Sequence, residues 1–242
     1  MKILIIRHGD PDYEHDTLTQ KGKREALALA DRMEKLPVKA VYVSPLGRAQ
    51  DTARPTLERK NMTAVTCDWL REFWPRITRG SEGAGHIVWD WLPAEWTLEP
   101  GYFDRDCWDQ TVVMKEADVG ASYRYVTEHF DALLASHGYV REGAYYRARQ
   151  ANNDTIVFFC HFGLECVLLS HLLNVSPMIL WHGCCAAPTS VTVLRSEERR
   201  EGIAYFRMSN FGDTSHLYAA GEPEAESARF CECYTNEDER HD

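Results

Sequence analysis

Residues 3–9 read ILIIRHG, an apolar run that stops abruptly at a cation, an imidazole and a glycine. Such a short run of β-branched and leucine residues is typical of a strand buried on both faces of a parallel sheet. In open α/β sheets, ligands bind just beyond the carboxyl ends of the strands. We therefore expect His8 to lie in an active site, with Arg7 holding an anion beside it.

Two later apolar runs end in the same way. Residues 40–43 read AVYV and lead through a turn into a helix-like segment that carries Arg48 near its start. Residues 156–160 read IVFFC and stop at His161, before an apolar helix predicted over residues 164–173. Because the carboxyl ends of neighbouring parallel strands meet at one edge of a sheet, these side chains are expected to form one pocket.

The remaining periodicity predicts further strands and helices. Thr19 is placed to cap a helix whose apolar residues recur at helical spacing, and residues 64–67, 191–194 and 205–208 are predicted strands. Alternating strands and helices call for a sheet covered on both faces. The fold class expected is α/β, a three-layer sandwich with a mostly parallel central sheet flanked by helices, plus an inserted helical or irregular cap.

The domain organisation follows from where this rhythm breaks. Residues 74–150 are poorly periodic and Trp-rich until one clear amphipathic helix over 120–136, so they are expected to form the inserted cap. The glutamate-rich residues 221–242 are expected to be a solvated or loosely attached acidic extension. We find no linker between independent domains, so residues 1–242 are interpreted as a single domain.

Tryptophan is concentrated in one part of the chain. Six of the seven tryptophans lie between Trp69 and Trp108. A cap with little regular structure needs bulky anchors, so core packing is the favoured interpretation. Trp89, Trp91 and Trp96 are the candidates to line a substrate pocket instead.

Composition limits the partners. Lys and Arg number 27 against 37 Asp and Glu, which gives a net charge of −10 and disfavours nucleic acid or an anionic membrane as a partner. No secretion-signal pattern or membrane-spanning apolar stretch is found, so a cytoplasmic location is expected. A homodimer is compatible with the sequence.

The eight cysteines are expected to be reduced thiols in that compartment. Cys160 and Cys166 lie in apolar segments and are predicted core residues. The closely spaced pairs near residues 184 and 231 lack the gap of common zinc sites, so no metal and no cofactor is expected.

The predicted pocket is suited to phosphoryl transfer. A phosphomonoester carries about two negative charges near neutral pH, and planar arginine forks bind its oxygens bidentately. A neutral imidazole can attack phosphorus in line, and the nearby cations disfavour a second proton on His8. The same charges stabilise the transition state, and His161 is expected to donate a further hydrogen bond.

An alkoxide leaving group also needs a proton. Glu72 is the best-placed carboxyl, because it follows the predicted strand over residues 64–67 and can later act as the base on the attacking water. The other carboxyl groups that could supply the proton are Asp10, Asp12 and Asp109. His216 follows the last predicted strand and is expected to support the site.

These residues form an ordered set that resembles the histidine phosphatase superfamily, in its phosphoglycerate mutase-like branch. The resemblance spans residues 3 to 163 and rests on Arg7-His8-Gly9, Leu18-Thr19-x-x-Gly22 (here LTQKG), Ser44-Pro45-Leu46-x-Arg48-Ala49-x-x-Thr52-Ala53, Leu70-x-Glu72 and His161-x-Gly163. It implies that His8 is phosphorylated, that Arg7, Arg48 and His161 form the phosphate pocket, and that Glu72 is the acid.

The resemblance also implies a function. We expect a phosphomonoesterase that acts on a small phosphorylated substrate through phospho-His8, with the backbone of Phe162 and Gly163 available to bind phosphate. A phosphoglycerate mutase-type phosphotransferase is the nearest alternative, although the gap from Gly9 to Leu18 is shorter than in cofactor-dependent mutases. A catalytically silent phospholigand-binding protein is the alternative from another class.

Overall fold

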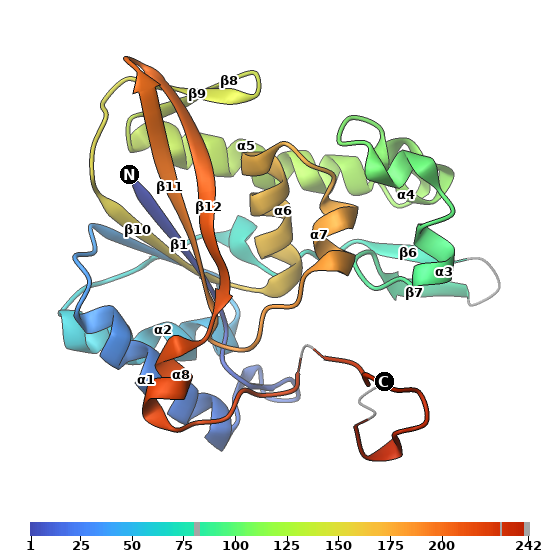
Figure 1. Cartoon of the computed structure of the whole chain (residues 1–242), viewed down its shortest axis with the longest axis horizontal. Coiled ribbons are helices and arrows are strands. Elements are labelled where there is room, and N and C mark those ends of the chain that lie inside the picture. The colour runs from blue at the N-terminus through green and yellow to red at the C-terminus, as the bar shows by residue number, and fades with distance from the viewer. Residues whose placement is uncertain (80–82, 228, 240–242) are drawn as a thin grey trace.

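The computed structural model describes residues 1–79, 83–227 and 229–239. One mixed sheet organises the chain (Figure 1). Its strands, in spatial order, are β5 (Val65–Thr66), β4 (Ala40–Val43), β10 (Thr155–Cys160), β1 (Lys2–Arg7), β11 (Val191–Arg200), β12 (Ile203–Asp213), β9 (Tyr145–Ala148) and β8 (Tyr139–Glu142). All of them except β11 and β9 point in one direction, which confirms the predicted mostly parallel α/β fold class.

Helices cover both faces of this sheet (Figure 1). They are α1 (Gln20–Glu34), α2 (Gly47–Lys60), α5 (Val119–Ser136), α6 (Phe162–Leu173), α7 (Pro177–Gly183) and α8 (Ser215–Ala220). Because side chains alternate along β1, Ile3 and Ile5 enter one core with α5, α6 and α7. Leu4 and Ile6 enter the other core, with α1 and α2. The predicted three-layer arrangement is therefore present.

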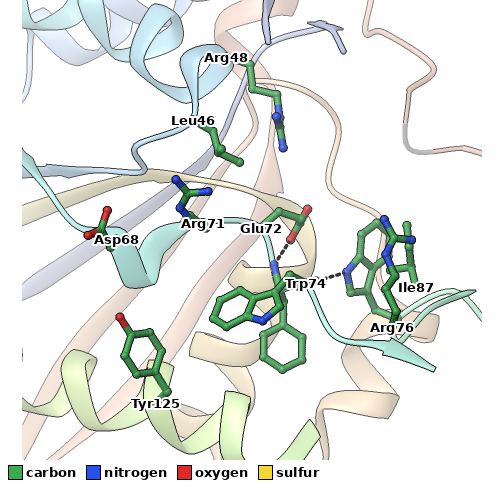
Figure 2. Close-up of a pocket in the computed structure, with 11 residues that line it drawn as sticks. Leu46, Arg48, Asp68, Arg71, Glu72, Trp74, Arg76, Ile87 and Tyr125 are labelled. Atoms are coloured by element: carbon green, nitrogen blue, oxygen red, sulfur yellow. Dashed lines mark hydrogen bonds between the residues drawn. The ribbon is translucent and has the colours of Figure 1, made fainter. Parts of the chain in front are cut away.

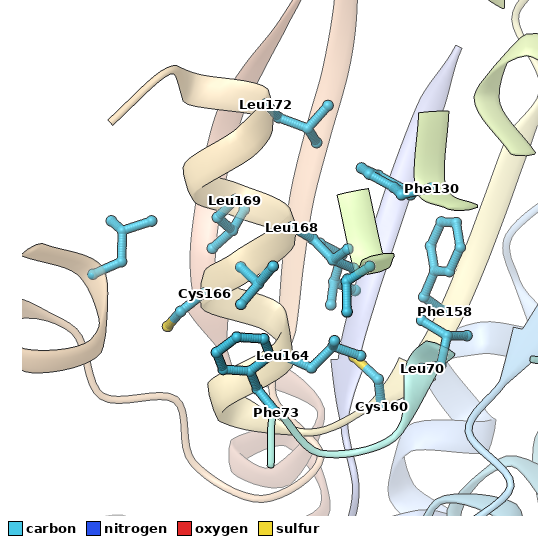
Figure 3. Close-up of a cluster of buried hydrophobic side chains, with 14 of the residues drawn as sticks. Leu70, Phe73, Phe130, Phe158, Cys160, Leu164, Cys166, Leu168, Leu169 and Leu172 are labelled. Carbon is cyan, nitrogen blue, oxygen red and sulfur yellow. The ribbon is translucent and has the colours of Figure 1, made fainter. Parts of the chain in front are cut away.

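The larger core is built around α6, an apolar helix that is buried for nearly its whole length (Figure 3). Leu164, Leu168 and Leu172 recur along α6 and are buried in the same cluster as Phe158 of β10 and Phe130 of α5. Full burial of each such side chain contributes roughly 1.5–3 kcal/mol. This packing fixes α6, and with it the site residues at its start.

The start of α1 explains a glycine of the LTQKG motif. The Thr19 hydroxyl accepts a hydrogen bond from the backbone N–H of Gly22 and caps the helix. A Cβ on Gly22 would lie 2.3 Å from the carbonyl oxygen of Asp10, far inside van der Waals contact. Glycine is needed here so that the loop after His8 can pack against α1.

The described part of residues 74–150 contains several short elements and the long helix α5. The short elements are the antiparallel pair β6 (Arg76–Arg79) and β7 (Gly83–Ile87), and then α3 (Pro93–Trp96), η3 (Pro100–Phe103), η4 (Trp108–Gln110) and α4 (Val112–Glu116). Trp108 is buried, and Trp91 and Trp96 pack against the main core. The same segment also supplies β8 and β9 to the main sheet, and the sequence pattern did not predict these two strands.

The segment after α8 is held more firmly than the predicted loose extension. Glu222 accepts hydrogen bonds from Arg24 at 2.9 Å and lies 3.3 Å from the Lys21 ammonium, both on α1. Farther along, the Ser227 carbonyl accepts a hydrogen bond from Arg7, the last residue of β1. Residues 222–227 are therefore anchored, and a short 3₁₀ helix, η5 (Glu237–Glu239), follows.

Shorter elements complete the framework: the two-residue strands β2 (Pro11–Asp12) and β3 (Thr17–Leu18) pair after β1, and η1 (Asp68–Leu70) follows β5. Across the described ranges, no helix is long and apolar enough to cross a membrane. Cys160 and Cys166 are buried, as predicted.

Candidate active site

Two histidines meet where β1 and β10 end. The strands are parallel, and their register pairs Arg7 with Cys160, so His8 and His161 leave the sheet side by side. The His8 N–H donates to the Cys160 carbonyl at 3.0 Å, and the two imidazole rings lie 5.2 Å apart between centroids. The structure thus brings together two residues that lie 153 positions apart in the sequence.

The His8 ring is held in one tautomer. Its Nδ1 lies 2.7 Å from the Gly9 carbonyl oxygen, and because a carbonyl only accepts, Nδ1 carries the proton. Nε2 is left with its lone pair. Burial lowers the pKa of His8 well below its usual value, and the Arg7 charge lowers it further, so the ring is neutral.

The backbone around this ring is also fixed by neighbouring segments. The Gly9 N–H donates to the Thr52 hydroxyl of α2 at 2.9 Å, and the Thr189 N–H donates to the His8 carbonyl at 3.1 Å. His216 does not contact His8 through this hydrogen bond but contacts Thr189, because its Nε2 lies 3.1 Å from the Thr189 hydroxyl. It contacts a residue that holds His8, which fits the expected supporting position.

Arg7 is buried and is held by backbone carbonyls. Its Nη1 donates to the Ala186 carbonyl at 2.6 Å and its Nη2 donates to the Ser227 carbonyl at 3.2 Å. Nε is buried and has no hydrogen-bond partner among the described residues. Neutral carbonyls orient the guanidinium without cancelling its charge, so Arg7 can still attract an anion.

Arg48 lies in the first turn of α2, as the sequence predicts. Its Nη1 donates to Asp16 Oδ1 at 2.7 Å, and its guanidinium lies over the Tyr13 ring, 5.4 Å from the centroid. Asp16 also accepts from the Gly47 N–H at 2.7 Å, which ties the loop after His8 to the start of α2. Asp16 was not singled out from the sequence; its position becomes visible only when that loop folds back.

His161 is the N-cap residue of α6 and is fully buried. Its Nε2 lies 2.8 Å from the Ser44 hydroxyl, just after β4, while its Nδ1 has no partner among the described residues. Burial lowers the pKa of His161 well below its usual value, and the nearby His8 and Arg48 lower it further. A neutral ring with one unsatisfied nitrogen is available to a ligand.

Glu72 follows η1 and lines the mouth of the site. Its Oε1 accepts from the backbone N–H groups of Phe73 at 2.8 Å and Leu164 at 3.0 Å, so one carboxyl oxygen is fixed. Burial raises the pKa of Glu72, which favours the protonated acid. A Cβ on Gly163 would come within 2.8 Å of Glu72 Oε1, so a larger residue here would force a neighbouring side chain to shift.

The other carboxyl groups considered for this place are engaged elsewhere. Asp10 accepts from the Thr19 hydroxyl at 2.6 Å, and Asp12 lies 2.9 Å from the His15 ring. Asp109 accepts a hydrogen bond from the Gln110 amide at 2.7 Å and lies in η4. Among these groups and Glu72, only Glu72 lines the pocket beside Arg48.

A buried carboxyl in the first turn after His161 was not identified from the sequence. Glu165 lies in the first turn of α6, and neither of its oxygens has a hydrogen-bond partner among the described residues. Burial raises the pKa of Glu165 to about 7, against the smaller opposing effects of Thr192 and the Arg7 charge. The sequence signal that could have identified Glu165 is a single acidic residue within the apolar run after His161.

A pocket of about 590 Å³ opens beside these residues (Figure 2). Arg48 and Glu72 both line the pocket and point toward each other. Trp74, Trp89 and Tyr125 supply aromatic lining. The N–H groups of Phe162 and Gly163, in the first turn of α6, lack intrahelical partners and favour an anion. In the described ranges, no group of three or more His, Cys, Asp or Glu could hold a metal ion.

Comparisons with known proteins show which family the chain belongs to. The family model for the histidine phosphatase superfamily (branch 1) matches residues 3–208. Phosphoserine phosphatase 1 of Hydrogenobacter thermophilus is 24% identical over 213 residues, which cover 84% of this chain and 90% of that protein. The 2,3-bisphosphoglycerate-dependent phosphoglycerate mutase of Thermoplasma acidophilum is 32% identical over 107 residues, 36% of this chain and 54% of that protein.

Solved structures show the same fold. A phosphoserine phosphatase mutant from Entamoeba histolytica, in complex with phosphoserine, is 21% identical with a TM-score of 0.57, covering 89% of this chain and 98% of that chain. A mycobacterial glucosyl-3-phosphoglycerate phosphatase is 22% identical with a TM-score of 0.58, covering 87% and 98%. The chain belongs to the histidine phosphatase superfamily. It is an enzyme of the phosphatase class, a phosphomonoesterase, as the sequence resemblance implied.

Proposed function

We propose that this protein hydrolyses a small phosphorylated metabolite-sized substrate through a covalent phosphohistidine on His8. The observation that carries the proposal is the His8 ring, which is buried and neutral and has Nδ1 bound to the Gly9 carbonyl. This arrangement leaves the Nε2 lone pair as the nucleophile. The names of the similar proteins, phosphoserine phosphatase among them, support a small phosphomonoester as substrate.

Binding of the phosphoryl group draws on the cations around His8. Arg7, Arg48 and the unsatisfied Nδ1 of His161 surround the ring, and the first-turn N–H groups of α6 add backbone donors. When the Ser44 hydroxyl donates to His161 Nε2, the His161 proton resides on Nδ1 and can be donated to a phosphoryl oxygen. These groups favour the charge that builds up on the equatorial oxygens.

In the first step, His8 Nε2 attacks phosphorus and a nitrogen–phosphorus bond forms. The bond from phosphorus to the ester oxygen breaks, and the leaving alkoxide takes the proton of the Glu72 carboxyl. The raised pKa of Glu72 keeps that proton available, and its fixed Oε1 leaves the other oxygen to face the cleft. General acid catalysis of this kind contributes about 10²–10⁴-fold.

In the second step, the Glu72 carboxylate removes a proton from water. The water oxygen bonds to phosphorus, the bond to His8 Nε2 breaks, and inorganic phosphate leaves. His8 returns to the neutral tautomer with its proton on Nδ1, and Glu72 is again protonated. No cofactor enters either step.

Turnover of p-nitrophenyl phosphate tests the proposal. His8→Ala is expected to lose about 10³-fold or more in kcat, because the nucleophile is removed. His15→Ala is the matched control, since this imidazole is largely exposed and faces Asp12 rather than the site. Turnover by His8→Ala at the parent's rate would refute the catalytic role of His8.

The alternatives make different predictions. A mutase would move phosphate between two carbons of its substrate without releasing inorganic phosphate. A silent binding protein would retain a phosphorylated ligand and release no phosphate from it. Colorimetric release of inorganic phosphate from a purified panel of phosphomonoesters therefore separates the three functions.

A further inference from the structure

The pocket beyond the phosphate-binding residues is larger than a phosphoryl group requires. Its volume of about 590 Å³ lies in the range of pockets that enclose whole small-molecule ligands. Arg48 and Glu72 belong to the phosphate site and also line this pocket, so a substrate phosphorylated next to His8 can extend its remaining atoms into this space (Figure 2). The other residues that line the pocket therefore indicate the chemistry of the rest of the substrate.

Two further cations line this pocket. Arg71 and Arg76 are exposed, and neither guanidinium forms an ion pair with a carboxylate of the described residues. Within the described ranges, the Arg76 guanidinium donates one hydrogen bond, to the Gly85 carbonyl at 3.3 Å. Figure 2 shows them on opposite sides of Trp74.

Acidic side chains do not cancel these charges. Besides Glu72, whose raised pKa favours the neutral acid, the acid that lines the pocket is Asp68. Asp68 and Arg71 lie on one side of the pocket, but they do not approach within ion-pair distance. Arg76, on the other side, has no acid beside it among the lining residues. In a protein with a net charge of −10, this local excess of positive charge marks a second place for an anion.

An apolar wall lies between the two arginines. Trp74 leaves 46% of its surface exposed, which is unusual for a tryptophan, and its ring meets Tyr125 of α5 edge-on at 6.2 Å. Trp89 is held by its Nε1–H, which donates to the Phe73 carbonyl at 3.0 Å. Of the three tryptophans singled out from the sequence, Trp89 is the one that lines this pocket.

We infer that the substrate is a phosphomonoester with a flat or apolar body that carries a second anionic group, a carboxylate or a second phosphate. The body packs on Trp74 and Trp89, and the distal anion binds Arg71 or Arg76. This inference rests on the proposed function, because the position of the scissile phosphate sets the substrate's direction. It concerns residues outside the phosphate pocket, which the family motifs do not assign.

Matched substrates test the inference. 3- and 4-carboxyphenyl phosphate each have a neutral counterpart of nearly equal shape, the corresponding carbamoylphenyl phosphate. The enzyme is expected to favour the carboxylate member of at least one pair about 10-fold in kcat/KM, since charge-assisted hydrogen bonds are the stronger ones. In Arg71→Met/Arg76→Met this preference is expected to fall to within about twofold of unity.

Controls keep the inference and the proposed function apart. Arg200→Met removes an exposed arginine at the far end of β11 and is expected to keep the full preference. Hydrolysis of both members of each pair at equal kcat/KM would overturn the inference and leave the phosphatase intact. If neither member is hydrolysed, the proposed function fails, and binding of the matching phosphonates to the protein decides the inference: equal affinity for the charged and neutral forms overturns it.

Tryptophan substitution tests the apolar wall. Trp74→Ala is expected to raise KM several-fold for both members of a pair, because the lost surface contacts the ring rather than the charge. It is expected to leave the carboxylate preference in place. An unchanged KM for all four aryl phosphates would remove Trp74 from the substrate contact and overturn that part of the inference.

Discussion

Glu165 offers a sharp test of how burial controls charge next to the site. Its carboxyl is buried in the first turn of α6 without a hydrogen-bond partner among the described residues. Burial raises the pKa of this carboxyl from 4.5 to about 7. Glu165→Gln keeps the shape of the side chain and removes its ability to ionise.

The sign and size of the effect follow from proton binding. Between pH 4.5 and 7 the folded protein holds a proton on Glu165 that the unfolded chain has released. The free energy of unfolding therefore falls as the pH rises through this interval, and the full loss is present above pH 7. At about 1.4 kcal/mol for each tenfold change in proton affinity, a pKa difference of about 2.5 corresponds to roughly 3 kcal/mol.

Urea unfolding at pH 4.5 and pH 8 measures this loss. The free energy of unfolding of Glu165→Gln, minus that of the parent, is expected to rise by about 3 kcal/mol from the lower pH to the higher. The buried amide adds a cost that does not depend on pH, so only the change with pH is interpreted. Glu58→Gln, at an exposed position of α2, is the matched control and is expected to give a flat difference. A difference for Glu165→Gln that stays constant within about 0.5 kcal/mol would refute the reasoning.

Three further predictions concern the acid, the α6 glycine and the core. Glu72→Gln is expected to lower the turnover of alkyl phosphates about 10²-fold or more and that of aryl phosphates only slightly. Turnover of alkyl phosphates by the parent should decline as the pH rises through the raised pKa of Glu72. Equal losses on both substrates would show that Glu72 is not the acid. Gly163→Ala places a Cβ within 2.5 Å of the Trp89 ring nitrogen. The kcat/KM for p-nitrophenyl phosphate should therefore fall about 10-fold. Unchanged kinetics would show that the ring can move aside. Leu168→Ala should destabilise the protein by about 2–5 kcal/mol in urea unfolding, whereas Leu27→Ala, half exposed on α1, should cost less than about 0.5 kcal/mol.

The part of the fold that carries the site was predictable from local pattern. The strands that end near residues 7, 43 and 160 are short apolar runs followed by polar residues, and this signal is contained within each run. The helix after His161 begins at Phe162 rather than residue 164, because His161 itself is the extended N-cap. The boundary shifted, but the position of the histidine did not.

Features that depend on distant pairing were not predictable. β8 and β9 are short, and β9 is stabilised by pairing with β12, which lies more than 50 residues later in the chain. The pairing of Asp16 with Arg48 and the contact of Ser227 with Arg7 likewise require the folded chain. No local periodicity encodes such contacts, so only the structure shows how the two arginines are held.

Trapping of the covalent intermediate tests the central claim most directly. The protein is mixed with excess p-nitrophenyl phosphate, quenched in alkali, where phosphohistidine survives, and digested for mass spectrometry. A buried, neutral His8 with Nε2 free predicts one phosphoryl group on the peptide that contains residue 8, and none in His8→Ala. Continued turnover with no labelled peptide, or with the label on His161, would contradict the account.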